Sequence, residues 1–433
     1  MPVAGVGQGS FGGKLGFLLV SLGIAPMTVV FGQSALWSAA GVDETLAAQA
    51  NAPVPSNTGL PHLGPVQLSL GALAGATYTD NVNYTQFNPE SDVLLNLGAD
   101  LGLYWAARER SQLQLQASLG YVWYLHEQQN NGFQVIPTSI LSYSASLDEV
   151  TATVYDQFGY TREVLTQAGV VNQATLPRLE NTAGVRLEWD PRQWAFQAGY
   201  SRYDYVSSQN SANAFLNRYA DYYFGRAGWR FAEHTEAGVE ASGAITRYRV
   251  ATQNNNSSLS LGGYADWQLR PSLSLSLRGG PILYVFDSNA NTAGGSTLNS
   301  YYLGFDANHQ LTDHLSQHLD VQHSVQAGQN QGSAYVEQLS VNYTLNEALT
   351  DHLTVGLTLT YENGRQPLPV TVGPFVFETI EHFDRYAASP QLSWRCTEKL
   401  TATLTYSYWL RNSDLPDRGY TINTVSLNLD YRF

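Results

Sequence analysis

The sequence has one cysteine and few charged residues. Cys396 is the only cysteine in 433 residues, so the chain cannot form an intramolecular disulfide framework. A structural zinc site built from several thiolates is excluded for the same reason. Charged residues make up 13% of the chain, about half of the roughly 25% that is usual in globular domains. The net charge of −14 argues against nucleic acid as a partner, because binding phosphates requires lysine and arginine.

Long apolar runs are also missing after residue 30. No later stretch approaches the roughly 18 consecutive apolar residues that a membrane-spanning helix needs. If the mature protein crosses a membrane, we expect it to do so as a closed barrel, in which every backbone polar group finds a partner.

Catalytic signatures are absent as well. The sequence contains no nucleophile elbow, Walker loop or dinucleotide fingerprint. The densest histidine group is His309, His314, His318 and His323. On a strand, His314 and His318 would lie about 13 Å apart, at roughly 3.3 Å per residue, so they cannot share one metal ion. We therefore expect no enzyme activity, no cofactor and no metal site.

The first 64 residues have the character of an export segment. Lys14 is the only charge before the apolar run from Leu15 to Val30, which Pro26 interrupts, and small residues follow at Ala35 and Ala40. This pattern predicts a cleaved signal peptide over residues 1–40. Residues 41–64 contain several prolines and small residues, which predict a periplasmic spacer of low structure.

Alternation of apolar and polar residues is the strongest positive signal, and it is clearest in the last strand. Val425, Leu427, Leu429, Tyr431 and Phe433 are apolar, and the residues between them are polar. Strict alternation places the two sets on opposite faces of a strand. By itself the stretch is compatible with the edge strand of a soluble β-sandwich or with a strand of a barrel.

The same stretch resembles the closing strand of a Gram-negative outer-membrane β-barrel. This resemblance implies that the protein resides in the cell outer membrane and contacts its lipids. It also implies that the barrel-assembly machinery reads a terminal signal, here Leu427, Leu429, Tyr431 and Phe433.

From Pro65 onward, long polar connections and short turns follow one another with a spacing of about forty residues, the length of one large hairpin. The long connections are centred near residues 85, 132, 172, 212, 254, 292, 331, 373 and 416. The pattern predicts an all-β fold over residues 65–433: a transmembrane antiparallel up-and-down β-barrel of about 18 strands, with short periplasmic turns and longer extracellular loops. Sixteen strands remain possible, because alternation is weak between Thr138 and Arg162.

Aromatic residues, which form 12% of the chain, concentrate near the predicted strand ends. Such a distribution is typical of the two aromatic girdles at membrane interfaces. The predicted members near the short turns are Trp105, Trp189, Trp194, Trp229, Phe231, Trp267, Tyr343, Trp394, Tyr431 and Phe433. Those predicted nearer the long connections are Trp123, Tyr143, Tyr200 and Tyr361.

The opposite face of the predicted strands is rich in hydroxyl, amide and charged side chains, which in a barrel would line an aqueous lumen. Acids outnumber bases among the candidates, which indicates a mild preference for cations. The lumen-lining candidates are Asp92, Asp100, Arg186, Glu188, Arg226, Arg230, Glu240, Asp266, Arg278, Asp306, Asp320, Glu362, Arg395, Asp430 and Arg432.

The segment from Gln366 to Ile380 differs from the other connections in being long, proline-containing and apolar. We predict a loop here, which either folds inward as a constriction or packs over the mouth of the barrel.

Among barrel families the chain resembles the porin-like group, partly through the stretch Thr77–Val82 after the first strand. The resemblance implies a porin-type channel for passive diffusion of small hydrophilic solutes or ions, and it is compatible with a homo-oligomer. Two alternatives stay open: an exopolysaccharide export barrel, and a closed structural or adhesive barrel that displays its surface loops.

Overall fold

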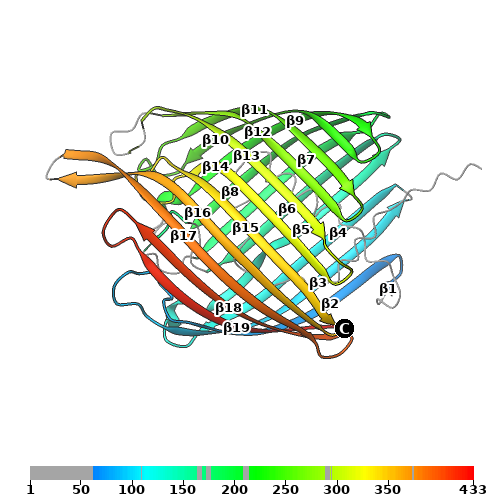
Figure 1. The fold of residues 1–433 in the computed structure, drawn as a ribbon, viewed down its shortest axis with the longest axis horizontal. Helices are drawn as coiled ribbons and strands as arrows, with labels where there is room; N and C mark the ends of the chain where they lie inside the picture. The colour runs from blue at the N-terminus through cyan, green and yellow to red at the C-terminus, as the bar shows by residue number, and fades with distance from the viewer. Residues whose placement is uncertain are drawn as a thin grey trace, which may run out of the picture.

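Eighteen long strands form the body of the protein (Figure 1). The computed structural model describes residues 62–108, 110–162, 168–171, 177–207, 214–287, 293, 295–372 and 375–433. The predicted signal peptide and all but the last three residues of the spacer lie outside these ranges. The strands are β2 (Val66–Thr79), β3 (Asp92–Arg108), β4 (Ser111–Tyr124), β5 (Gly132–Leu147), β6 (Val150–Thr161), β7 (Arg178–Trp189), β8 (Trp194–Ser207), β9 (Arg218–Ala232), β10 (Thr235–Tyr248), β11 (Asn256–Arg270), β12 (Leu273–Phe286), β13 (Thr297–Gln310), β14 (Leu315–Ala327), β15 (Tyr335–Thr350), β16 (Leu353–Val372), β17 (Phe375–Arg395), β18 (Leu400–Ser413) and β19 (Tyr420–Arg432).

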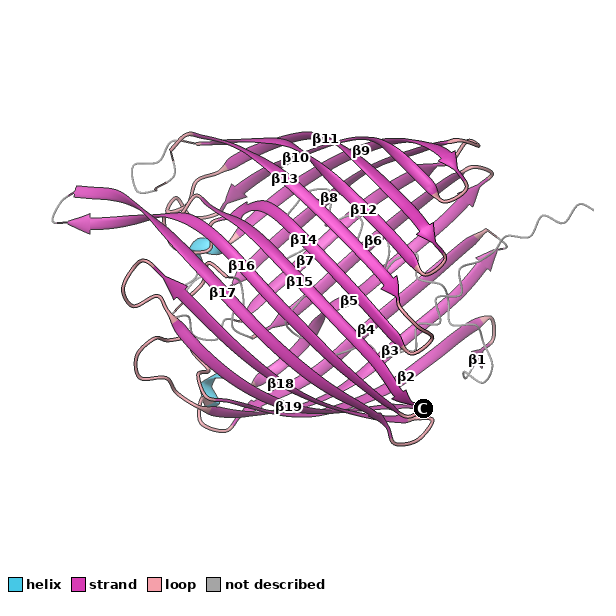
Figure 2. Ribbon diagram, viewed as in Figure 1, coloured by secondary structure: helices cyan, strands magenta, loops and turns pink. Residues whose placement is uncertain are grey.

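Each long strand pairs antiparallel with its neighbours in sequence, and β19 pairs with β2. The sheet is thereby closed into a barrel, which confirms the predicted fold class and the count of 18 strands. The short strand β1 (His62–Leu63) adds a two-residue pairing to the start of β2. Two 3₁₀ turns, η2 (Gln128–Asn130) and η3 (Ala214–Leu216), lie in the long connections (Figure 2). Within the described residues, no helix is long and apolar enough to span a membrane.

The outer face of the barrel is apolar because alternation holds along the strands. In β3, Leu95, Leu97 and Leu101 are exposed, whereas Asn96 and Asp100 on the other face are half-buried. β19 repeats the pattern, with Leu427 and Leu429 exposed. An exposed apolar face on a closed sheet cannot be covered by a second sheet of the same chain, so the soluble sandwich is excluded.

Exposed aromatic side chains occur toward both ends of the barrel wall. Near the short turns, the exposed predicted residues are Trp105, Trp189, Trp194, Trp229, Phe231, Trp267, Trp394, Tyr431 and Phe433. Tyr343 is half-buried and donates its hydroxyl to Gln317 Oε1 at 2.9 Å. The placement of Tyr143 near a long connection was wrong. Tyr143 is five residues before Asp148, which lies in the short β5–β6 turn, and eleven residues after Gly132, where β5 begins. This turn was not located from the sequence.

Three of the short turns contain a threonine whose hydroxyl accepts hydrogen bonds from the backbone. Thr312, Thr350 and Thr397 each accept hydrogen bonds at their hydroxyl from the backbone N–H groups two and three residues later, at 3.0 to 3.2 Å. A hydroxyl that satisfies two N–H groups replaces the ladder bonds lost where the chain reverses. This hydrogen bonding accounts for the threonine in the sequence that recurs at these three turns: a threonine, an acidic residue, a histidine or lysine, and a leucine.

Two tyrosine hydroxyls on the inner face lie over glycines that are two strands away. A Cβ at Gly262 in β11 would overlap the Tyr302 hydroxyl of β13, and a Cβ at Gly228 in β9 would overlap the Tyr264 hydroxyl of β11. The missing side chains let the rings reach carboxylates across the wall: Tyr302 donates to Glu240 at 2.8 Å and Tyr264 to Glu236 at 2.6 Å. The glycines of β9 and β11 therefore leave room for the tyrosine side chains that cross the inner wall.

The segment from Gln366 to Ile380 is not a loop. β16 and β17 stay in register from Gln366↔Glu381 to Val372↔Phe375. The two strands extend past the rest of the barrel as a ribbon, orange at the left of Figure 1. The prediction of a loop that folds inward or over the mouth was wrong, because the segment completes its own antiparallel ladder.

Candidate functional site

The predicted lumen-lining residues do not form one cluster. Cross-strand partners share a face. The pairs Asp306↔Asp320, Asp306↔Ser276 and Ser276↔Asp266 therefore place Asp266, Asp306 and Asp320 on one face. Arg278 is two residues from Ser276 on the same strand and so shares that face. Most candidates are paired with an opposite charge or with polar groups. The ion pairs are Arg186 with Glu188 (2.7 Å), Arg226 with Asp266 (2.6 Å), Arg230 with Glu236 (3.0 Å) and Asp190 (2.5 Å), Arg385 with Glu362, and Arg432 with Asp430 (3.5 Å).

Several inner-face charges near the long connections were missed by the sequence reasoning. Arg178 pairs with Glu180 at 2.6 Å and Arg411 with Glu381 at 2.9 Å, and in both pairs the arginine is buried. The missed charges are Arg178, Glu180, Arg218, Glu236, Glu381, Arg385, Arg411 and Arg418. Arg178, Arg218 and Arg411 stand at strand ends, where alternation gives way to loop sequence. Arg418 lies in the β18–β19 connection, and Glu236 lies beside the short β9–β10 turn. With them included, acids and bases on the inner face are nearly balanced.

The segment Ala168–Val171, in the connection between β6 and β7, is buried throughout. These four residues contact inward-facing side chains of β8–β10 and also of β15–β19. Since β16 stands opposite β6 and β7 in the ring of strands, the segment reaches across the interior of the barrel.

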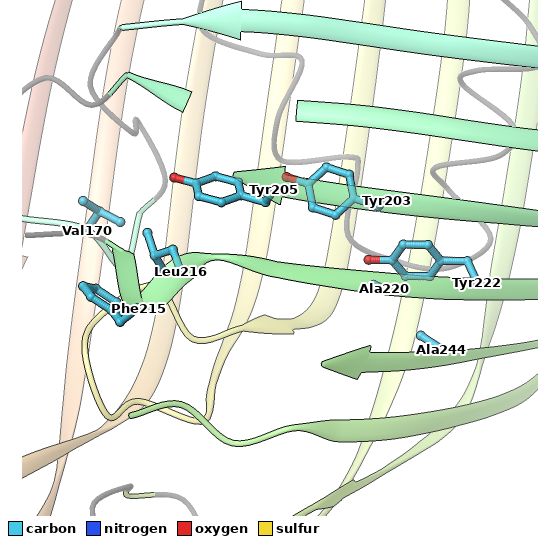
Figure 3. Packing of buried hydrophobic residues seen from close by; sticks show 8 residues of the cluster. All are labelled: Val170, Tyr203, Tyr205, Phe215, Leu216, Ala220, Tyr222 and Ala244. Carbon is cyan, nitrogen blue, oxygen red and sulfur yellow. The ribbon is translucent and has the colours of Figure 1, made fainter. Parts of the chain in front are cut away.

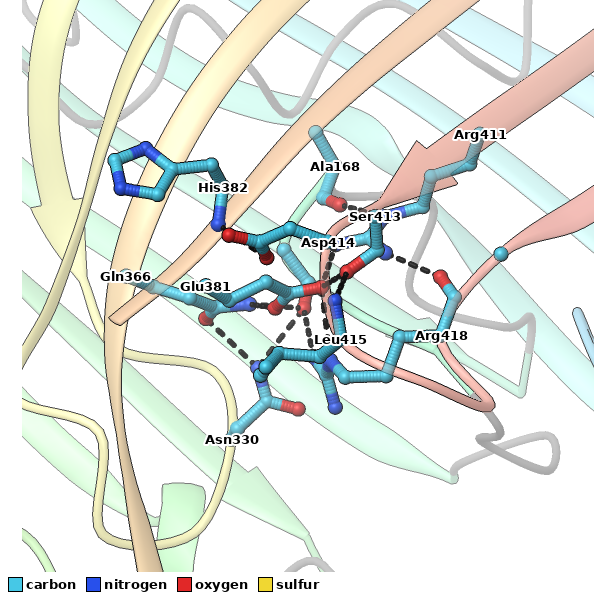
Figure 4. A network of polar contacts seen from close by, with 12 residues as sticks. Ala168, Asn330, Gln366, Glu381, His382, Arg411, Ser413, Asp414, Leu415 and Arg418 are labelled. Atoms are coloured by element: carbon cyan, nitrogen blue, oxygen red, sulfur yellow. Dashed lines mark hydrogen bonds and ion pairs between the residues drawn. The ribbon is translucent and has the colours of Figure 1, made fainter. Parts of the chain in front are cut away.

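Two backbone carbonyls hold this segment to the far wall (Figure 4). The Gly169 carbonyl accepts from Asn330 Nδ2 at 2.8 Å, Gln366 Nε2 at 2.9 Å and Arg418 Nη2 at 3.2 Å. The Ala168 carbonyl accepts from Arg411 Nε at 2.9 Å. Buried backbone carbonyls that lack a partner are costly, so this set of donors makes burial of the segment possible.

Glu381 of β17 is the common acceptor that most of these donors also bind. Its carboxylate, which is fully buried, receives Arg411 Nη2 and Arg418 Nε at 2.9 Å each, Ser413 Oγ at 2.7 Å and Gln366 Nε2 at 2.6 Å. Three of these four residues also bind the Ala168 or Gly169 carbonyl (Figure 4). One carboxylate therefore orients most of the groups that anchor the segment.

Apolar contacts complete the anchoring. Val170 packs with a cluster on β8–β10 that includes Tyr205, Phe215 and Leu216 (Figure 3). Val171 packs with Trp409, Tyr420 and Ile422, and Ala168 with Val336 and Phe383. Four consecutive residues thus join three separate clusters on different parts of the wall. We define Ala168–Val171 and its polar partners as the constriction.

The four histidines do not meet. His318 lies on the inner face, with Nδ1 2.8 Å from Asn308 Oδ1 and Nε2 3.4 Å from Asp306. His309 lies beside Gln317, and the ring of His323 stacks on Tyr301 with centroids 4.0 Å apart. In the part of the chain that the structure describes, no three His, Cys, Asp or Glu side chains are grouped so that they could hold a metal ion.

Thr77–Val82, the stretch that carried part of the family resemblance, ties the first loop to the last strand. Asp80 accepts from the backbone N–H and side-chain amide of Asn423 at 2.7 and 2.6 Å, and Asn81 Nδ2 donates to the Thr421 carbonyl at 3.1 Å. These contacts continue the β19–β2 seam beyond its last ladder pair, Thr424↔Thr79.

Comparison with known proteins shows a similarity in architecture only. No family model and no curated protein matches the sequence. Among solved structures, the chain is similar to OpdK from Pseudomonas aeruginosa, crystallised with vanillate (TM-score 0.44, 11% identity, 84% of this chain and 98% of that chain). It is also similar to OccAB2 from Acinetobacter baumannii (0.45, 10%, 84% and 98%) and to a BenF-like porin from Pseudomonas fluorescens Pf-5 (0.46, 10%, 84% and 99%). Identities this low and TM-scores below 0.5 support no transfer of function, which must be inferred from the geometry of the chain itself.

Proposed function

We propose that the protein is a porin-type channel of the Gram-negative outer membrane for passive diffusion of small hydrophilic solutes or ions. The apolar outer wall with its exposed aromatic residues suits a lipid surrounding. The charged and hydroxyl-rich inner wall suits an aqueous path.

The constriction is the observation that carries this proposal. An eighteen-stranded barrel encloses a wide interior, and a segment held across it by the opposite wall narrows the path that solutes would take. A conduit for a long polysaccharide would require this segment to leave the interior, which its four carbonyl-directed hydrogen bonds oppose.

Single-channel recording of the refolded protein in planar bilayers tests the proposal. We expect discrete conductance steps, together with swelling of proteoliposomes in small solutes. Membranes that contain inserted protein but stay silent would favour the closed structural or adhesive barrel. Passage of glycan chains, with no size limit for small solutes, would favour export.

Charge selectivity is a separate part of the proposal. The predicted lumen-lining residues alone favour cations mildly, and the additional inner-face arginines reduce that bias. We retain the prediction of a weak cation preference. Reversal potentials measured across a KCl gradient test it, and anion preference would contradict it.

We also propose that Leu427, Leu429, Tyr431 and Phe433 form the assembly signal. The first three side chains are exposed on the outer wall, and the backbone N–H of Phe433 donates to the Leu70 carbonyl at 3.0 Å across the seam. Deletion of Phe433 should lower the amount of folded protein in the outer membrane and leave the conductance of the inserted fraction unchanged. Heat-modifiable mobility on gels measures the first effect, and normal insertion would contradict the proposal.

We infer that residues 1–40 direct export and that residues 41–64 are a periplasmic spacer before the barrel of residues 65–433. Sequencing the N-terminus of the mature protein tests this division, and cleavage after Ala35 or Ala40 is the expected result.

A further inference from the structure

A cavity lies in the inner wall of β9–β13, beside the constriction. It is partly open, and side chains of these strands form its wall. Its lining includes Tyr222 and Ala244, which also belong to the apolar cluster around Val170. A solute at the constriction would therefore be next to this cavity.

The polar groups of the cavity offer both donors and acceptors. Glu240 is almost fully buried and accepts the Tyr302 hydroxyl at 2.8 Å. The hydroxyls of Ser242 and Ser260 lie 2.6 Å apart on the neighbouring strands β10 and β11. The rings of Tyr284 and Tyr302 and the side chain of Ile282 provide apolar surface. Polar and charged groups beside aromatic rings are typical of a site that orients a ligand.

The charges at the cavity are already balanced. Arg226 pairs with Asp266 at 2.6 Å and lies over the Tyr264 ring, 3.3 Å from its centroid. Arg218 is buried, donates to the Leu216 carbonyl at 3.1 Å and has the ring of Tyr205 5.0 Å away. An anion would meet the carboxylate of Glu240, and a cation would meet two guanidinium groups. The cavity suits a ligand without net charge.

We propose that this cavity is a binding subsite for a neutral sugar. A pyranose has C–H faces that pack on the rings of Tyr284 and Tyr302, and its hydroxyl groups can donate to Glu240 and exchange hydrogen bonds with Ser242 and Ser260. The inference rests on the proposed channel function, because it makes the sugar one of the solutes that pass the constriction.

The experiment measures D-glucose binding to the full-length folded protein. Isothermal titration calorimetry in detergent reports affinity whether or not the barrel conducts, and glucose-dependent interruption of single-channel current reports binding in the open path. D-glucuronate, and D-glucosamine in its protonated form, serve as charged analogues. We expect both to bind about tenfold more weakly than glucose, since each brings a charge that a balanced site does not neutralise.

Glu240→Gln keeps the size of the side chain and removes its charge. We expect glucose affinity to fall about tenfold, the usual effect of replacing a hydrogen bond to a charged acceptor by a neutral one. The matched control is Glu236→Gln on the same strand. Glu236 also accepts a tyrosine hydroxyl, from Tyr264 at 2.6 Å, but is not part of the cavity lining. The control should bind glucose as the wild type does.

The outcomes separate the two proposals. Silent membranes with normal calorimetric glucose binding would refute the channel and support the subsite. Normal conductance without glucose binding, stronger binding of glucuronate than of glucose, or equal losses in the two glutamate variants would overturn the subsite and leave the channel intact.

Discussion

Two connections of this barrel differ in a way that explains its interior. The outer part of the β16–β17 hairpin, Gln366–Ile380, is apolar and contains three prolines, and the hairpin projects from the barrel as a two-stranded ribbon. The β6–β7 connection contains the small residues Ala168–Val171, and these are buried inside. The apolar sequence of the β16–β17 connection led to the prediction that it folds inward or over the mouth of the barrel. The segment inside the barrel comes instead from the β6–β7 connection.

Backbone hydrogen bonding accounts for the difference. In the ribbon, each strand supplies the partner of the other from Gln366↔Glu381 to Val372↔Phe375, so it needs nothing from the barrel wall. Ala168–Val171 belongs to no ladder, and its carbonyls are satisfied by side chains of the opposite wall. A connection without its own ladder must find donors elsewhere, and this inner wall provides them.

The largest effect is expected from Glu381→Ala. The change leaves Arg411 and Arg418 without the carboxylate that orients them and costs about 3–5 kcal/mol, as is usual when a buried ion pair loses one partner. We expect the segment to detach, single-channel conductance to rise and resistance to thermal unfolding to fall.

The matched control for this change is Glu378→Ala, which removes an exposed carboxylate from the ribbon on the same strand. Conductance and stability should stay at wild-type values. If both variants had equal conductance, the constriction would not limit the ion path.

A smaller effect is expected from Asn330→Ala. Asn330 Nδ2 is one of three donors to the Gly169 carbonyl and also donates to Gln366 Oε1 at 2.8 Å. The loss of these two neutral hydrogen bonds costs about 2 kcal/mol. We expect frequent brief excursions to a higher conductance in single-channel records, with the main level unchanged. Asn363→Ala is the control, because that amide binds Asp384 at 3.0 Å, away from the constriction. A steady current in the Asn330 variant would contradict the prediction.

The smallest effect is expected from shortening the ribbon. Replacing Pro369–Glu378 with Asn-Gly joins the paired residues Leu368 and Thr379 by a two-residue hairpin turn. Because the removed part completes its own ladder beyond the barrel, conductance and glucose binding should not change. An altered single-channel conductance would show that the ribbon reaches the ion path.

The sequence alone was sufficient to predict the strands of the barrel wall, but not the segment that lies inside the barrel. Alternation such as that of Leu95, Leu97 and Leu101 predicts strands, faces and strand count, because it depends on neighbours within a few residues. The anchors of Ala168 and Gly169 lie between 161 and 249 residues away along the chain. Small residues carry no local pattern that would indicate such partners.

The remaining errors of prediction arose where the ends of strands were placed wrongly. Arg411 and Glu381 were not recognised as inner-face charges because both lie beside connections, where alternation was no longer followed. The ribbon was mistaken for a loop because its prolines suggested a break. Pro367 and Pro369 nevertheless stand within the extended ladder of an edge hairpin, where proline is tolerated.

The constriction is attached to the wall in two ways that respond differently to substitution. Every residue has a carbonyl, so the hydrogen bonds accepted at Ala168 and Gly169 do not depend on the side chains at these positions. The side chains of Val170 and Val171 pack against the wall. A substitution at either valine would therefore weaken the apolar contacts and leave the hydrogen bonds in place.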